Sequence, residues 1–180
     1  MQDLTIKRRL ANMVTRIVLM QRVPMRIRDD MHGQYVDPQF RFLYPPNWTL
    51  RESADDSVRM VEVESPDRLA YLMVSVHVNR SYYEIMSEAL GVMVCEYKGL
   101  HSLAIEASID GHSAQGYDLE FVTLDFPVGG FLRSIDTPEG GLMIQGQWSE
   151  VDDESTNVTH ADVISAILTS IELDFADESD

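Results

Sequence analysis

Residues 109–121 read IDGHSAQGYDLEF, and residues 129–148 read GGFLRSIDTPEGGLMIQGQW. This stretch contains three strand-like runs that are separated by glycine and proline. The Gly-Gly pairs at residues 129–130 and 140–141 lack the strand-turn-helix setting of a phosphate-binding loop and are typical of hairpin turns. These patterns predict an antiparallel meander, and we expect the rest of the chain to pack around it.

Periodic patterns on both sides of the meander predict further strands and helices. Residues 40–50 begin with alternating aromatics and reach a double proline, which indicates a first strand and a tight turn that carries Trp48 into the core. Asn79 or Ser81 precedes one helical pattern and Thr159 precedes another, and all three are suitable N-terminal caps. We expect the other strands at residues 58–64, 70–78 and 100–110, and the helices at residues 82–97 and 161–171.

Together these elements predict an α+β fold, with an antiparallel sheet of about six or seven strands flanked by helices. The chain has 180 residues, of which 44% are hydrophobic, and this is enough for one sizeable core. We therefore expect a single α+β domain at residues 39–173. A basic helical arm is expected at residues 1–38 and an acidic tail at residues 174–180.

Charge is distributed unevenly between the arm and the rest of the chain. Residues 1–38 carry seven Lys or Arg and four acids, whereas residues 39–180 carry seven Lys or Arg and 26 acids. The net charge of -16 argues against a nucleic-acid partner and favours basic ones. Residues 4–22 have the period of a basic amphipathic helix. Its apolar face is expected to pack on the acidic body of the same chain, on a second copy, on a partner protein or on an anionic membrane surface.

No pattern for catalysis, a cofactor or a metal ion is present. The five histidines, His32, His77, His101, His112 and His160, stand singly, without the spacing of a metal site. Asp118 and Glu120 alternate onto one face of a strand, where a solvated acidic face is a simpler interpretation than a catalytic pair. Cys95, the only cysteine, lies in a helical pattern with no neighbour to activate it, so we expect a buried or half-buried bystander.

The alternation of side chains along the strands assigns residues to two sheet faces. Leu72, Val74 and Val76 define the core face, which we expect both helices to cover. The matching core positions in the meander are expected at Tyr117, Leu119, Phe121, Leu142, Ile144 and Trp148. The opposite face combines methionines, amides and acids, and this adaptable surface suits a basic amphipathic helix. The candidate partner-binding residues there are Met60, Tyr71, Met73, His77, Asp118, Glu120, Met143, Gln145 and Gln147. Arg133 is placed to pair with Asp118 or Glu120.

The order of elements, the FLYPPNW motif at residues 42–48 and the Ile109-Asp110-Gly111 turn resemble the Mog/PsbP-like superfamily, including its bacterial DcrB-type branch. The resemblance covers about residues 40–173. It implies an antiparallel sheet flanked by helices, no shared active site, and mostly non-enzymatic roles. Those roles include Ran binding, photosystem association and chaperoning of secreted effectors. The basic arm has no counterpart in that family.

The function predicted from the sequence is a non-enzymatic protein-binding or adaptor module, resembling a chaperone, for a basic or helical segment. One alternative is a scaffold that docks on a membrane surface or an assembly through residues 4–22. A remote alternative is a small-molecule hydrolase that uses Asp118, Glu120 or His112. A cytoplasmic location is expected, because the one cysteine can form no internal disulfide and no signal peptide is recognisable.

Overall fold

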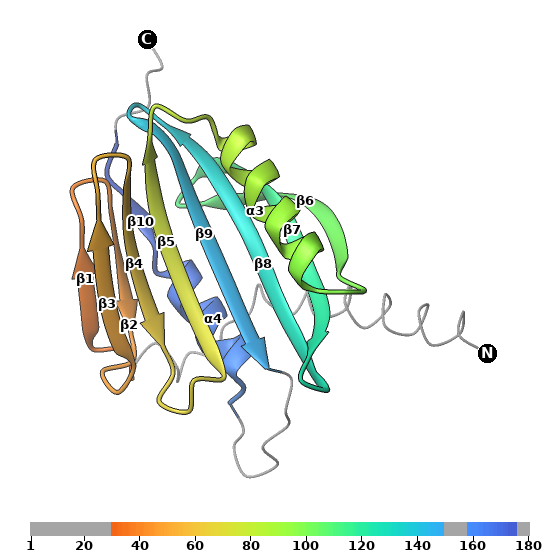
Figure 1. The fold of residues 1–180 in the computed structure, drawn as a ribbon. Coiled ribbons are helices and arrows are strands. Elements are labelled where there is room, and N and C mark those ends of the chain that lie inside the picture. The colour runs from red at the N-terminus through yellow and green to blue at the C-terminus, as the bar shows by residue number, and fades with distance from the viewer. Residues whose placement is uncertain (1–29, 150–157, 176–180) are drawn as a thin grey trace.

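The computed structural model describes residues 30–149 and 158–175 (Figure 1). The predicted helix within residues 4–22 and most of the acidic tail lie outside these ranges. The described residues form two antiparallel sheets and two helices, which confirms the predicted α+β class. Strand β1 (Gly33–Val36) falls within residues 1–38 and pairs with β2, so the sheet structure begins before residue 39.

The larger sheet has seven strands in the order β3-β4-β5-β9-β8-β7-β6, and every neighbouring pair is antiparallel. The strands are β3 (Thr49–Ala54), β4 (Val58–Glu64), β5 (Ala70–Val78), β6 (His101–Ile109), β7 (His112–Thr123), β8 (Phe126–Thr137) and β9 (Gly140–Ser149). Strands β7, β8 and β9 form the predicted meander. Strand β3 was not predicted, because its sequence does not alternate between apolar and polar residues.

A smaller sheet has the order β1-β2-β10, with β2 at Phe40–Tyr44 and β10 at Glu172–Leu173. The aromatic rings of Tyr35, Phe40, Phe42 and Tyr44 pack against one another along β1 and β2, with neighbouring centroids 5.4–6.2 Å apart. Trp48 is buried after the double proline, as predicted. Strand β10 is too short to leave a pattern in the sequence.

Both helices begin at a capping box, in which the N-cap side chain and the third helical residue bond to each other's backbone N–H. Helix α3 (Tyr82–Glu96) is capped by Ser81 with Glu84, and helix α4 (His160–Thr169) is capped by Thr159 with Asp162. These boundaries confirm the two predicted helices. Cys95 on α3 is exposed, and not buried or half-buried as expected.

The helices cover opposite faces of the seven-stranded sheet, which corrects the expectation that both cover the core face (Figure 1). Helix α4 and the smaller sheet pack on the face of Leu72, Val74 and Val76. Helix α3 packs on the other face, where Ile85, Met86 and Met93 contact a second apolar cluster. That cluster contains Leu119, Phe121, Val128, Leu132 and Met143. The sheet therefore has an apolar core on each side.

The second core also corrects the faces assigned to β7. In the β7–β8 register, Tyr117 lies opposite Leu132 and Asp118 lies opposite Phe131. Tyr117, Leu119 and Phe121 thus face α3, whereas Asp118 and Glu120 lie on the α4 face. Strand alternation identifies the residues that share a face, but β7 alone does not show which face of the sheet that is.

The first Gly-Gly pair is not a turn, because Gly129 and Gly130 lie inside β8. A Cβ atom on Gly129 would come within 2.8 Å of the Trp148 ring, so the glycine makes room for that indole. The β7–β8 turn is formed instead by Leu124 and Asp125, which have φ angles of 48° and 68°. The second pair does begin strand β9 at the β8–β9 hairpin.

Arg133 and Asp118 form a buried ion pair on the α4 face, which confirms the pairing expected from the sequence. The Arg133 guanidinium also donates to the carbonyl oxygens of Tyr117 and Leu132, both at 2.8 Å, and lies over the Phe131 ring. Burial lowers the pKa of Arg133, and the Asp118 carboxylate opposes that shift. The pair thus keeps a charge in the interior next to the aromatic core.

Removing one partner of this pair should destabilise the protein far more than removing both. Asp118→Leu leaves the guanidinium buried without a counter-ion, and we expect it to lower the free energy of unfolding by about 3–5 kcal/mol. The double variant Asp118→Leu/Arg133→Met should recover most of that loss. Chemical denaturation monitored by circular dichroism measures both. Equal destabilisation in the single and double variants would contradict this role of the ion pair.

Candidate binding groove beside helix α3

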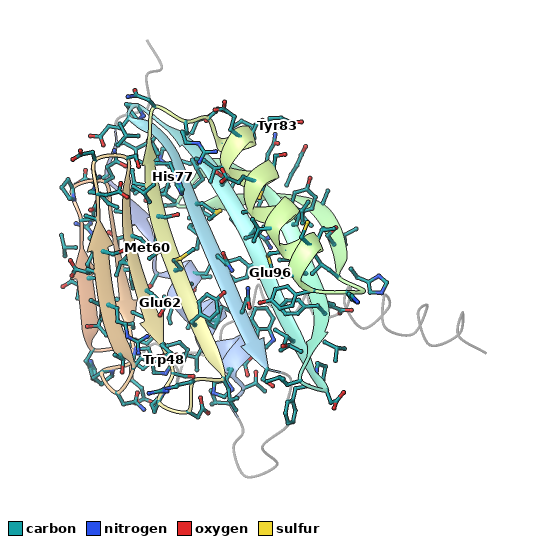
Figure 2. All side chains as sticks on the ribbon, in the orientation of Figure 1. Trp48, Met60, Glu62, His77, Tyr83 and Glu96 are labelled. Atoms are coloured by element: carbon teal, nitrogen blue, oxygen red, sulfur yellow. The ribbon has the colours of Figure 1, made fainter. Side chains whose placement is uncertain are left out.

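A groove of about 340 Å³ runs between helix α3 and strands β5 and β9. We call it the β5/β9 groove. Its lining residues are Tyr71, His77, Arg80, Ile85, Glu88, Ala89, Val92, Met93, Glu96, Tyr97, Met143, Gln145 and Gln147. Figure 2 shows this face toward the viewer, with His77 on β5, Met60 and Glu62 on the neighbouring strand, and Glu96 near the lower end of α3.

The groove has an apolar floor that is continuous with the α3 core. Met93 and Met143 are buried, whereas Val92 on the outer side of α3 is 51% exposed. Tyr97 closes the C-terminal end of the helix by stacking on Phe121, with ring centroids 4.2 Å apart. The floor therefore presents thioether and aliphatic carbon to any segment that lies along the helix.

Two polar contacts fix side chains at the strand wall of the groove. The Gln145 side-chain amide donates to the Tyr71 hydroxyl at 2.7 Å. Burial raises the pKa of Tyr71, and the nearby Tyr97 adds to that shift, so the phenol stays neutral. The Ser75 hydroxyl and His77 Nε2 are hydrogen-bonded at 2.9 Å, while His77 Nδ1 is buried and has no hydrogen-bond partner within residues 30–149 and 158–175.

The rim of the groove is acidic. Arg80 pairs with Glu88 at 2.5 Å, and Glu96 has no ion-pair partner among the described residues. On the strands beyond β5, the exposed Arg51 is shared by Glu62 at 3.1 Å and Glu64 at 2.7 Å. Arg51 and Arg80 are thus already paired, whereas the negative charge of Glu96 has no such partner in the described part of the chain.

Seven of the nine candidate residues lie on this face. Tyr71, His77, Met143, Gln145 and Gln147 line the groove. Met60 lies on β4 of the same face, opposite Ser75, and Met73 packs against the core beneath α3. The sheet face predicted for Asp118 and Glu120 was wrong, because the β7–β8 register places both on the α4 face.

The helix side of the groove was missed from the sequence, because α3 was expected on the other face. Val92, Glu88 and Glu96 come from this helix. A signal for them does exist, since Val92 falls outside the apolar stripe that packs on the sheet and is nonetheless apolar. Single apolar residues on a helix surface are common, so this signal alone does not identify a contact surface.

A second groove, of about 600 Å³, lies on the other side of α3. We call it the β6/β7 groove. Its lining residues are Tyr82, Tyr83, Met86, Ser87, Leu90, Gly91, Val94, Ala104, Ile105, Glu106, Gln115, Gly116 and Tyr117. Tyr83, labelled at the upper end of α3 in Figure 2, and Val94 are 70% and 57% exposed. Helix α3 is therefore flanked by apolar grooves on both sides.

The residues considered for catalysis do not meet in either groove, since neither is lined by Asp118, Glu120 or His112. Among residues 30–149 and 158–175, no three His, Cys, Asp or Glu side chains are grouped to hold a metal ion. No helix in these residues is long and apolar enough to span a membrane.

No model of a known protein family matches the chain, and no curated protein matches its sequence. Solved structures of similar arrangement include a protein from Bacteroides thetaiotaomicron VPI-5482, with a TM-score of 0.48 and 12% identity over 82% of this chain. The match spans about half, 49%, of that protein. LpqN, involved in cell envelope biogenesis of Mycobacterium tuberculosis, matches with a TM-score of 0.45 and 17% identity. That match covers 82% of this chain and 94% of LpqN.

The immunity protein TplEi of T6SS from Pseudomonas aeruginosa, in complex with "L" peptide, gives a TM-score of 0.44 and 12% identity. That match covers 91% of this chain and 84% of TplEi. At TM-scores below 0.5, these likenesses carry no conclusion about family or function. The resemblance to the Mog/PsbP-like superfamily stays a prediction from the sequence.

The groove histidine should make stability depend on pH. Burial lowers the pKa of His77 below its ordinary value of 6.5, and Arg80 adds to that shift while Glu88 opposes it. The unfolded chain therefore takes up the proton first, so this stabilisation is present above pH 6.5 and is lost as pH falls through the folded pKa. We expect the unfolding free energy to fall more between pH 7.5 and 5.5 in the wild type than in His77→Gln. Parallel pH profiles from urea denaturation would contradict the assignment.

Proposed function

We propose that the chain is a non-enzymatic protein-binding module that takes a basic amphipathic helix of a partner protein in the β5/β9 groove. The observation that carries the proposal is the combination of an apolar floor, at Met93 and Met143, with Glu96 at the rim, an acid that forms no ion pair with another described residue. An amphipathic helix presents matching chemistry, since its apolar stripe meets the floor and its flanking Lys or Arg meet the acids.

The side chains of the groove suit an adaptable site. Methionine has three rotatable bonds and a polarisable sulfur, so Met143 and Met93 adjust to the shape of an incoming side chain. Gln145 and Gln147 offer both donors and acceptors at the strand wall. Such a surface selects for apolar contact and positive charge more than for one particular sequence.

Electrostatics supports a basic partner. Residues 39–180 have a net charge of -19, which draws a cationic segment toward the domain over a distance of roughly one Debye length, about 8 Å in physiological salt. The same field repels acidic proteins and nucleic acids. We further infer a cytoplasmic location, supported by the single cysteine, Cys95, which has no second cysteine to pair with.

The test is binding of a synthetic Leu/Lys amphipathic helix, labelled with fluorescein, to the full chain. Val92→Lys places a positive charge at the exposed helix wall of the β5/β9 groove, and we expect it to weaken the affinity by about tenfold or more. The matched control is Val94→Lys, which alters an equally exposed valine of α3 in the other groove and should change the affinity by less than about twofold. Fluorescence anisotropy measures both, with circular dichroism to verify the fold.

Val92 is substituted in preference to Met143, because Met143 is buried and a polar residue there would disturb the α3 core. Glu96→Lys should weaken the binding of the same peptide and reduce the salt dependence of that binding. Unchanged affinity in both Val92→Lys and Glu96→Lys would refute the β5/β9 groove as the binding site.

A further inference from the structure

Strand β6 is an edge of the seven-stranded sheet, and in the described part of the chain it hydrogen-bonds only to β7. It is nine residues long, and residues 101–104 are exposed. Its sequence, HSLAIEASI, contains no Pro, Gly, Lys or Arg and only one acid. Proteins commonly protect edge strands by short length, charge or proline, so β6 lacks the usual protection against pairing.

The opposite edge differs in these respects. Strand β3 has six residues and carries Arg51 and Glu52 in its centre. Short length and charge both disfavour the addition of another strand there. Strand β6 is therefore the edge of this sheet that is open to an added strand.

The β6/β7 groove adjoins this open edge on the α3 side. Ala104 and Glu106 of β6 form one wall, and Tyr83, Leu90 and Val94 of α3 form the other. A strand added next to β6 directs every second side chain toward the α3 face, because side chains alternate along a strand. Its backbone would bond to β6, and its inward side chains would reach the groove.

The elements around the groove are acidic. Among the described residues, Glu106 lines the β6/β7 groove and no Lys or Arg does. The rest of the body is acidic as well, because residues 39–180 have a net charge of -19. Charge complementarity thus selects a segment with basic residues. A second copy of the chain would bring the same acidic surface against this one, which opposes pairing of β6 with itself.

We propose that an extended, basic peptide segment of a partner protein binds as an eighth strand alongside β6, with alternate apolar side chains in the β6/β7 groove. This site is separate from the β5/β9 groove, since α3 lies between the two. It recognises a partner through backbone hydrogen bonds to the strand and through side-chain pockets, the combination that strand addition uses.

The probe is an acetylated peptide of alternating Val and Lys, with a control peptide of the same composition in which the alternation is broken. We expect the alternating peptide to bind the full chain more tightly than the control. Val94→Lys should weaken its binding by about tenfold or more, whereas the matched variant Val92→Lys should change it by less than about twofold. Hydrogen exchange on the wild type should show new protection at the outward β6 amides, those not bonded to β7, when the peptide is bound.

Several results would overturn the proposal. Equal effects of the two valine variants would place the peptide elsewhere, as would β6 amides that gain no protection. If the outward β6 amides, which do not bond to β7, are already protected in a monomer without peptide, the chain itself covers the edge. Concentration-dependent self-association that protects the same amides would identify a second copy as the occupant. Failure of the helical peptide to respond to Val92→Lys concerns only the β5/β9 groove and leaves this test unaffected.

Discussion

The architecture depends on the central strands β8 and β9, which are apolar on both faces. In β8, Phe131 belongs to the core beneath α4, and its neighbour Leu132 belongs to the core beneath α3. In β9, Ile144 and Met143 divide in the same way. A strand with apolar side chains on both sides requires a cover on both sides, so the sheet cannot have one solvated face. The opposite placement of α3 and α4 follows from this requirement.

The widths of a helix and of the sheet explain why grooves flank α3. Seven strands spaced about 4.8 Å apart span roughly 29 Å, whereas a helix with its side chains is about 10–12 Å wide. On the α4 face, the helix shares the area with the smaller sheet. On the other face, α3 is the only helix among the described residues, and it packs chiefly on β8 and β9. Apolar surface therefore stays accessible on either side of the helix, beside β5 and beside β6.

Elements with a local sequence pattern could be predicted from the sequence. Strands β4 and β5 have the predicted bounds, because regular alternation is interrupted by turn residues at their ends. Ser81 and Thr159 identify the helix starts through short-range caps. Strands β1, β3 and β10 are short or irregular and exist because of their partners in space, so no local pattern predicts them.

The errors at the candidate site have the same origin. Leu119 and Phe121 share a face with Tyr117, as their alternation indicates, but the register with β8 decides which face that is. Because β8 is apolar on both faces, either orientation of β7 finds an apolar partner, and the pattern alone does not distinguish them. Seven of the nine candidate residues come from β4, β5 and β9, whose shared face was assigned correctly, and the two misplaced acids come from β7.

The two grooves differ in what they offer a partner, and the cause lies in the sheet order. Strands β5 and β9 are interior strands, so their backbone N–H and C=O groups are already bonded on both sides. A segment in the β5/β9 groove contacts only side chains, and a helix, which satisfies its own backbone, suits that surface. In the described part of the chain, β6 is hydrogen-bonded on one side only, so an extended segment beside it gains backbone hydrogen bonds. The position of each groove relative to the edge thus determines which conformation of a partner segment binds there.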